Sequence, residues 1–166
     1  MLKNIKIFVI PGGGGKTTLS KKNNKFIDID DFWDITGQTE TKMIQEFKEA
    51  RKNNNDKLVK KIINDCMNYK AIKLKNSLNN NNYDSIILVQ SVEQANIINN
   101  DNKNIFCFVP SEQLHESLME KRKDSDFIKN VCRYQRKKII NSGLKFFCYY
   151  DFNEFEKLIN QFVKLN

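Results

Sequence analysis

The sequence predicts an α/β protein, with a three-layer fold in which helices cover both faces of a five-stranded parallel sheet. Short apolar runs alternate with segments of helical periodicity, which is the pattern of parallel strands joined by right-handed crossovers. Each run is nearly continuous in hydrophobicity, as expected of a strand that is buried on both faces. The five runs are Ile5–Ile10, Phe26–Asp30, Ser85–Gln90, Ile105–Val109 and Phe146–Tyr150. Ligands of such sheets bind beyond the carboxyl ends of the strands, so the residues that follow each run are the first candidates for function.

Length and composition suit a single domain, 1–166. The chain has 166 residues and is 40% hydrophobic, which is enough for one core and too much for a disordered protein. We see no apolar run long enough to span a bilayer. The first ten residues lead directly into a glycine-rich loop without a small-residue cleavage site. We therefore interpret them as a strand and not as a signal peptide.

The strongest functional signal follows the first strand, in the segment 11–19, PGGGGKTTL. Glycines allow backbone N–H groups to turn inward around phosphate oxygens without side-chain clashes. A helix that begins near Lys16 would direct its positive end at the same anion. Lys16 would reach the β- and γ-phosphates of a nucleoside triphosphate, and the Thr17 hydroxyl would ligate Mg²⁺. The other residues expected to contact the nucleotide are Gly12, Gly13, Gly14, Gly15 and Thr18.

Two carboxylates mark the end of the second strand. Asp28 and Asp30 are two residues apart, so in a strand their side chains point to the same side. Phosphoryl transfer needs a group that orients or deprotonates the attacking hydroxyl and a carboxylate that helps to hold the metal ion, and this pair can supply both. Asp31 is interpreted as a capping or turn residue.

The segments between the strands carry helical signals. Ser91, Ser111 and Asp151 are expected to cap helices, the first and last of them as capping boxes with Gln94 and Glu154. Apolar residues at helical spacing form three stripes. The stripes are Met43, Ile44 and Phe47; Leu58, Val59, Ile62, Ile63 and Cys66; and Phe155, Leu158, Ile159 and Phe162. The asparagine-rich stretches 53–55 and 79–82 are interpreted as surface loops or helix ends.

The net charge of +8 favours anionic partners such as nucleotides, phosphorylated metabolites or nucleic acid. Lysine is abundant throughout the chain and forms no dense basic block, so charge alone is a weak argument for nucleic-acid binding. Arginine is rare, and three of the four arginines, Arg122, Arg133 and Arg136, lie close together. They are candidates for bidentate phosphate contacts, and chance clustering is the alternative.

The cysteines form no C-x-x-C pair, which argues against a metal or redox motif. Cys107 and Cys148 lie in strand-like runs and are interpreted as small core residues. Cysteine usage of this kind is typical of a reducing compartment, so we expect a cytoplasmic protein without a membrane partner. His115, the only histidine, is expected to lie on the surface or to pack against a helix rather than to act in catalysis.

With these motifs, the chain resembles the nucleoside-monophosphate-kinase-like P-loop kinases, and most of all the branch of the shikimate and gluconate kinases and the kinase modules of polynucleotide kinases. Segment 10–18 resembles their G-P-P-G-S-G-K-[ST]-T loop (Walker A), and segment 26–31 resembles their F-x-D-x-D strand end. Segment 105–122, IFCFVPSEQLHESLMEKR, resembles their fourth strand and the helix that leads to the lid. The resemblance covers essentially the whole chain, but only the first two motifs are specific.

The resemblance implies the P-loop NTPase fold with strand order 2-3-1-4-5, an acceptor-binding region at 33–84 and a lid region at 111–141. It implies that Asp28 serves the metal site together with Thr17, and that Asp30 contacts the acceptor hydroxyl. Arg122 falls on the lid arginine that touches the ATP phosphates. Arg133 and Arg136 fall where a second lid or post-lid arginine is found. The implied cofactors are ATP and Mg²⁺, and the implied catalytic residues are Lys16, Asp30 and Arg122.

The sequence departs from the family pattern at four places. Ile10 replaces the first glycine of the loop, and Trp33 stands where the polynucleotide kinase branch usually has an arginine. Ser117 and Leu118 stand where many relatives carry an earlier lid arginine. The third strand ends in Gln90 and lacks a Walker-B aspartate, which fits a branch in which the carboxylate of strand two takes the metal role.

The sequence therefore predicts a small kinase that transfers the γ-phosphoryl group of Mg·ATP. Three acceptors stay open. They are a nucleoside monophosphate, held by Lys42, Lys48, Arg51 or Trp33; a small polyol or sugar acid; and a nucleic-acid 5′-hydroxyl. A non-catalytic ATP- or GTP-binding switch is the alternative from another class, favoured by Ile10 and by the missing early lid arginine. A basic nucleic-acid-binding protein with a vestigial loop is a further alternative.

Overall fold

The computed structural model describes residues 5–79 and 85–163. They form a five-stranded, all-parallel sheet in the order β2-β3-β1-β4-β5, which confirms the predicted fold class and strand order. The strands are β1 (Ile7–Val9), β2 (Phe26–Asp28), β3 (Ile86–Val89), β4 (Ile105–Pro110) and β5 (Phe146–Tyr149). In this order β1 lies at the centre of the sheet, and the glycine loop leaves its carboxyl end between β3 and β4.

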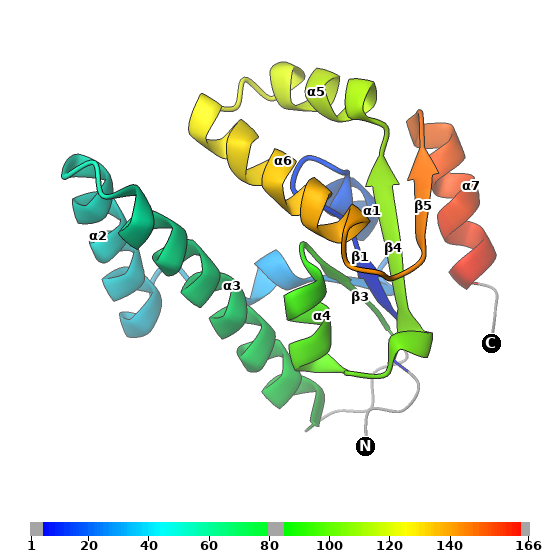
Figure 1. Ribbon diagram of the computed structural model, residues 1–166. Helices are drawn as coiled ribbons and strands as arrows, with labels where there is room; N and C mark the ends of the chain where they lie inside the picture. The colour runs from blue at the N-terminus through cyan, green and yellow to red at the C-terminus, as the bar shows by residue number, and fades with distance from the viewer. Residues whose placement is uncertain (1–4, 80–84, 164–166) are drawn as a thin grey trace.

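Helices cover both faces of the sheet (Figure 1). One face packs against α3 (Asp56–Asn79), α4 (Val92–Ile98) and α6 (Asp126–Ile140), and the other packs against α1 (Lys16–Lys22) and α7 (Phe152–Val163). The remaining helices are α2 (Gln38–Lys52) and α5 (Glu112–Lys121), with short 3-10 turns η1 (Ile29–Phe32) and η2 (Asn102–Asn104). Within the described residues, no helix is long and apolar enough to cross a membrane.

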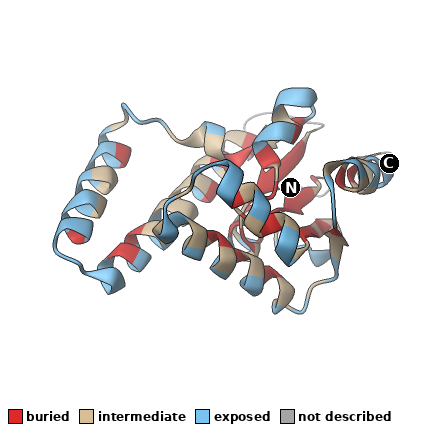
Figure 2. Ribbon diagram, turned by 90° about the horizontal axis from the view of Figure 1, so that it is seen from above, coloured by how far each residue is buried: buried red, intermediate tan, exposed pale blue. Residues whose placement is uncertain are grey.

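The two faces of the sheet build two separate cores. On β1, Ile7 and Val9 pack with the helices of one face, whereas Phe8 and Ile10 pack with the opposite face, as the period of two along a strand requires. Figure 2 shows the buried residues on the strands and on the helix surfaces turned toward them. Because the central strands are covered on both sides, their sequences are continuously apolar.

The outer strand β5 differs from this prediction. Phe146 at its start is 39% exposed and Cys148 is only partly buried, whereas Cys107 on β4 is fully buried. The reason is that side chains alternate between the two faces: Phe147 and Tyr149 pack in one core, whereas Phe146 and Cys148 point to the opposite face and belong to neither core. The expectation of a core residue is therefore correct for Cys107 and too strong for Cys148. All four cysteines are free thiols.

The predicted helix caps are confirmed, with one change. Ser91, Ser111 and Asp151 each accept a hydrogen bond from the amide three residues on. The side chains expected to complete the two capping boxes accept instead from the residue before the cap, Gln90 or Tyr150. They therefore fix the direction in which the chain enters the helix, rather than satisfying the cap's own amide.

The predicted acceptor-binding and lid regions meet at a projecting tip. Region 33–84 contains α2 and α3, and region 111–141 contains α5 and α6. Residues 53–55 form the turn between α2 and α3, as predicted, whereas residues 80–82 of the second asparagine-rich stretch lie outside the described residues. Phe127 at the start of α6 packs on Phe47 of α2, and the Arg51 guanidinium lies 4.3 Å from the centre of the Phe127 ring. The two regions therefore touch at their outer ends.

Candidate active site

The glycine loop folds as an anion-binding turn. The Gly14 amide donates to the Pro11 carbonyl at 2.9 Å, and Gly13 and Gly15 adopt positive φ angles of 78° and 96°. Only glycine adopts this conformation readily. Helix α1 begins at Lys16, and the first amides of an α-helix have no acceptor within the helix, so they are available to a phosphate in front of it. The Thr18 amide donates back to the Gly15 carbonyl, which leaves Thr18 as part of the helix rather than of the turn.

Ile10, at the position of the expected first glycine, is part of the core. Its amide continues the β-sheet pairing with the Val89 carbonyl at 2.9 Å, and its side chain is fully buried. A Cβ placed on Gly14 would lie only 2.7 Å from Cγ2 of Ile10. The space that the larger side chain needs is therefore provided by a glycine later in the loop. This compensation explains how the turn forms without glycine at position 10.

Replacing Ile10 by alanine should destabilise the fold rather than improve the loop. The side chain is 0% exposed, so its loss leaves a cavity between the sheet and the glycine turn. We expect the free energy of unfolding to fall by about 2–5 kcal/mol. Chemical denaturation measures this change, with Ile35→Ala as the control because Ile35 is 70% exposed. Equal stability of the two variants would show that Ile10 does not support the loop.

Three side chains from distant parts of the chain hold the loop in place. The Tyr149 hydroxyl donates to the Gly14 carbonyl at 2.6 Å, and burial raises the pKa of Tyr149, which keeps this donor protonated. His115 Nε2 lies 2.7 Å from the Gly12 carbonyl, and Gln135 Oε1 accepts from the Gly12 amide at 2.9 Å. The sequence did not indicate Tyr149 or Gln135, because nothing in a linear pattern connects residues more than 100 positions apart.

His115 has a packing role, as one of its two predicted interpretations requires. It is 1% exposed on α5, and its ring donates to the loop through Nε2. Burial lowers the pKa of His115, and Arg136 and Arg122 lower it further, against the opposing influence of the Gly12 carbonyl and Glu116. The imidazole is therefore neutral at pH 7.

Acidification should destabilise the folded protein through His115. In the unfolded chain its pKa returns to the ordinary value of 6.5, so below that pH the unfolded state binds the proton more readily than the folded state. The thermal unfolding midpoint should decrease as the pH is lowered from about 7.5 to about 5.5. In His115→Gln, which keeps a donor for Gly12, the decrease should be smaller. Equal slopes for the two proteins would contradict this role of the only histidine.

The predicted lysine, threonine and two aspartates converge at the mouth of the loop. Lys16 Nζ lies 3.3 Å from Asp30 Oδ2 and 3.7 Å from Asp28 Oδ1. The Thr17 hydroxyl donates to Asp28 Oδ2 at 3.5 Å. One detail of the prediction is wrong: β2 ends at Asp28, and Asp30 lies on the 3-10 turn η1. The reason is local, because the Asp28 carboxylate accepts from the Asp30 amide and turns the chain out of the strand.

The two carboxylates have opposite electrostatic environments. Burial raises the pKa of Asp28, and the attraction of Lys16 does not offset it. Burial acts in the same direction on Asp30, but Lys16 and then Lys70 outweigh it, so the pKa of Asp30 is lowered. Asp30 is therefore firmly ionised at neutral pH, as a group that orients an acceptor hydroxyl must be.

A chain of hydrogen bonds, which the sequence did not indicate, connects Asp30 to the loop. Lys70 Nζ donates to Asp30 Oδ1 at 2.6 Å, and Gln90 Nε2 donates to Asp30 Oδ2 at 2.8 Å. Gln135 Nε2 donates to Gln90 Oε1 at 3.3 Å. Gln135 Oε1 accepts a hydrogen bond from the Gly12 amide. Helix α6, strand β3 and the loop are thus linked to one carboxylate. Gln90 occupies the strand end that lacks a Walker-B aspartate.

The three clustered arginines lie at different places. A Cβ placed on Gly13 would be 3.5 Å from Arg122 Nη1, so the half-exposed Arg122 guanidinium lies over the loop. Arg136 Nε donates to the Pro110 carbonyl at 2.9 Å, at the carboxyl end of β4. Arg133 forms two hydrogen bonds with Glu116, of 2.7 and 2.6 Å, and so joins α6 to α5. In this conformation Arg122 is the arginine that the structure brings to the loop.

The basic residues considered for an anionic acceptor lie elsewhere on α2. Lys42 is exposed with its Nζ 4.0 Å from Glu46 Oε1, and Lys48 is also exposed. Arg51 covers the Phe127 ring at the tip. The cation that the structure brings to Asp30 from this region is instead Lys70 on α3.

Trp33 lies beside this lysine rather than in a core cluster. Its ring is edge-on to Tyr69, with the ring centres 6.3 Å apart, and Lys70 Nζ lies 5.4 Å from the centre of the Trp33 ring. The tryptophan is partly exposed and flanks the lysine that holds Asp30. It therefore borders the site without filling the core.

Thr17 and Asp28 are suitable ligands for Mg²⁺. Both offer oxygen atoms, which Mg²⁺ prefers, and they are already in hydrogen-bond contact. No group of three or more histidine, cysteine, aspartate or glutamate side chains that could hold a metal occurs in the described ranges. Mg²⁺ would therefore take its other ligands from nucleotide phosphates and water, as it does in many phosphoryl-transfer sites.

No protein-family model matches the chain, and no curated protein matches it. The function proposed below rests on the sequence motifs and on the geometry of the site.

Proposed function

We propose that the protein is an ATP-dependent phosphotransferase, a small P-loop kinase that acts on an acceptor hydroxyl or phosphate. The observation that carries the proposal is the convergence of Lys16, Thr17, Asp28 and Asp30 at the mouth of the glycine turn. Phosphoryl transfer requires a cation and helix amides that bind the phosphates, oxygen ligands that bind Mg²⁺, and an ionised carboxylate that contacts the acceptor. The four free thiols also agree with a cytoplasmic location.

The charged side chains of the site compensate one another. Lys16 is 6% exposed and is compensated by both aspartates. When the triphosphate binds, the Lys16 ammonium turns to the β- and γ-phosphates, and Lys70 remains to keep Asp30 ionised. Thr17 and Asp28 would hold Mg²⁺, which would offset charge on the phosphate oxygens.

The transfer itself is an exchange of two P–O bonds. The acceptor oxygen bonds to the γ-phosphorus while the bond from the γ-phosphorus to the ADP oxygen breaks. For a hydroxyl acceptor, Asp30 orients the group and takes its proton. Arg122, which lies over Gly13, stabilises the charge that develops on the transferred group. Arg133 and Arg136 would join it only after a lid movement that opens their present contacts.

The test is label transfer from γ-labelled ATP with Mg²⁺ to a panel of nucleosides, nucleoside monophosphates, polyols, sugar acids and 5′-hydroxyl oligonucleotides. We expect label on one acceptor class and no label with Lys16→Ala. ATP binding without transfer to any acceptor would overturn the proposal in favour of the nucleotide-binding switch. Nucleic-acid binding that is steeply salt-dependent and unaffected by Lys16→Ala would favour the vestigial-loop alternative.

A further inference from the structure

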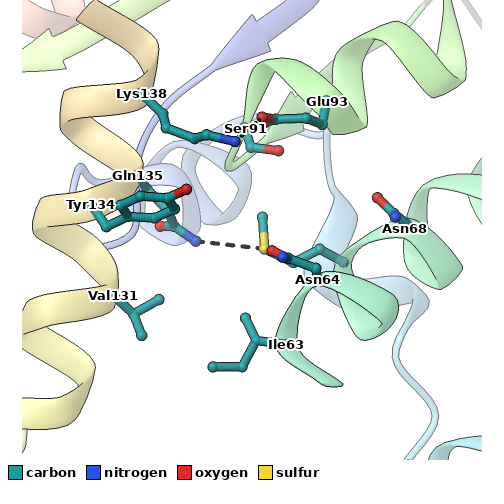
Figure 3. Close-up of a pocket in the computed structure, with 10 residues that line it drawn as sticks. Ile63, Asn64, Asn68, Ser91, Glu93, Val131, Tyr134, Gln135 and Lys138 are labelled. Atoms are coloured by element: carbon teal, nitrogen blue, oxygen red, sulfur yellow. Dashed lines mark hydrogen bonds and ion pairs between the residues drawn. The ribbon is translucent and has the colours of Figure 1, made fainter. Parts of the chain in front are cut away.

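A cavity of about 210 Å³ separates α3 from lid helix α6 and reaches the hydrogen-bond chain that ends at Asp30. It adjoins a second, outer cavity of about 500 Å³, and the two share Ile63, Asn64, Val131 and Tyr134. We call the two together the α3–α6 cleft. Figure 3 shows side chains of both helices facing one another across it, with Gln135 pointing inward at its inner end.

The walls of the cleft combine apolar surface with amide groups. Ile63, Met67 and Val131 contribute the apolar part. Asn64 and Asn68 are exposed along one side, and the Tyr134 ring opposite is 58% exposed. Apolar walls with a few polar groups are typical of sites for small organic ligands.

The charges along the cleft cancel. Lys138 Nζ and Glu93 Oε1 form an ion pair of 2.5 Å at the inner cavity. The outer cavity carries one cation, Lys60, and one anion, Asp56. An acceptor that bears a phosphate or carboxylate would lose its hydration here without gaining a surplus of positive charge. The lining therefore favours an uncharged ligand, although the whole chain has a net charge of +8.

We propose that the α3–α6 cleft binds the phosphoryl acceptor and that this acceptor is an uncharged nucleoside, an inference that rests on the proposed kinase function. An asparagine amide both donates and accepts, which matches the mixed edge of a nucleobase. The exposed Tyr134 ring, whose centre lies 5.5 Å from Lys138 Nζ, offers a stacking surface for the base. The sugar hydroxyl then points toward Gln135 and Gln90, whose side-chain amides form the hydrogen-bond chain to Asp30.

The cleft also accounts for the role of Gln135. Its side chain is 6% exposed and is held by the Gly12 amide, Gln90 and Met67. A sugar hydroxyl that joins Gln90 as a hydrogen-bond donor to Asp30 would be placed next to the glycine turn, where the γ-phosphate is expected. Gln135 thus connects the cleft to the glycine loop.

Equilibrium binding tests the assignment. We would titrate the full-length protein, with a non-hydrolysable ATP analogue and Mg²⁺ present, with adenosine, guanosine, cytidine and uridine, with their 5′-monophosphates, and with ribose. At least one nucleoside should bind, with an affinity about tenfold or more above that of ribose and not below that of its monophosphate. Tighter binding of the monophosphate, or no nucleoside binding at all, would overturn the assignment.

Two variants locate the site. Asn64→Leu and Tyr134→Ala change exposed side chains, so the fold should be retained, and each should weaken nucleoside binding about tenfold or more. Asn160→Leu, an exposed asparagine on α7 at the other face of the sheet, is the matched control and should bind as the wild type does. Unchanged binding by both cleft variants would place the nucleoside elsewhere and overturn the assignment.

Binding and transfer distinguish this inference from the proposed function. A nucleoside that binds in the cleft while no acceptor of the panel receives label would contradict the kinase function and leave the cleft as a ligand site. Label on a sugar acid or a nucleoside monophosphate alone would support the kinase and overturn the nucleoside assignment.

Discussion

Replacing Lys16 by alanine should lower kcat/KM for phosphoryl transfer by about 10³-fold or more. The reason is that Lys16 is the buried cation of the site, 6% exposed and directly behind the glycine turn. Its ammonium group would contact the β- and γ-phosphates in the ground state and hold them as charge redistributes during transfer. The loss should therefore appear in both ATP affinity and turnover.

A matched control exists on the same helix. Lys21 is exposed in the last turn of α1, so Lys21→Ala removes the same charge from the same element without touching the loop. Steady-state transfer and ATP titration would be measured for both variants, with circular dichroism to confirm that each is folded. If Lys16→Ala and Lys21→Ala were equally active, Lys16 would not be a phosphate ligand.

The features that the sequence predicted well depend on short-range patterns. Strand β1 and the turn that follows it are contiguous, and the positive φ angles at Gly13 and Gly15 explain why glycines are needed there. The parallel sheet followed from the alternation of apolar runs and helical stripes. Asp28 and Asp30 were found because they are two residues apart at a strand end, even though Asp30 lies on a turn and not on the strand.

The features that it missed depend on long-range contacts. Lys70 is one of many lysines on amphipathic helices, and only the packing of α3 against η1 brings it to Asp30. Gln135 and Tyr149 hold the loop from α6 and β5, and no local motif marks either residue. Arg133 had the spacing of a lid arginine, but its guanidinium is hydrogen-bonded to Glu116 on α5. Such pairings are decided by tertiary structure, which single-chain patterns do not encode.

The site also explains why Ile10 and Gln90 depart from the pattern of the resemblance. Gly14 makes room for the Ile10 side chain, so a glycine later in the loop compensates for the absence of glycine at position 10. Gln90 holds Asp30 in place by donating an amide hydrogen bond of 2.8 Å. A carboxylate at position 90 would instead add a third negative charge beside Asp28 and Asp30. A neutral amide is therefore the better partner for a carboxylate that must stay ionised.

Replacing Asp30 by asparagine should lower kcat by about 10²–10⁴-fold, while the KM for ATP changes little. The carboxylate accepts hydrogen bonds from Lys16, Lys70 and Gln90, and its lowered pKa makes it a permanent acceptor at neutral pH. Asparagine keeps the size of the side chain but lacks the charge that orients and deprotonates a hydroxyl. ATP contacts come from the loop and from Lys16, which loses one carboxylate partner in Asp30→Asn but keeps the other, Asp28.

The adjacent Asp31 provides the control for this substitution. It is exposed on η1, so Asp31→Asn removes one negative charge from the same turn while leaving the site intact. Rapid-quench measurement of a single turnover separates the chemical step from product release and would report the loss in Asp30→Asn directly. A rate within about threefold of the wild type would show that the acceptor is activated by another group.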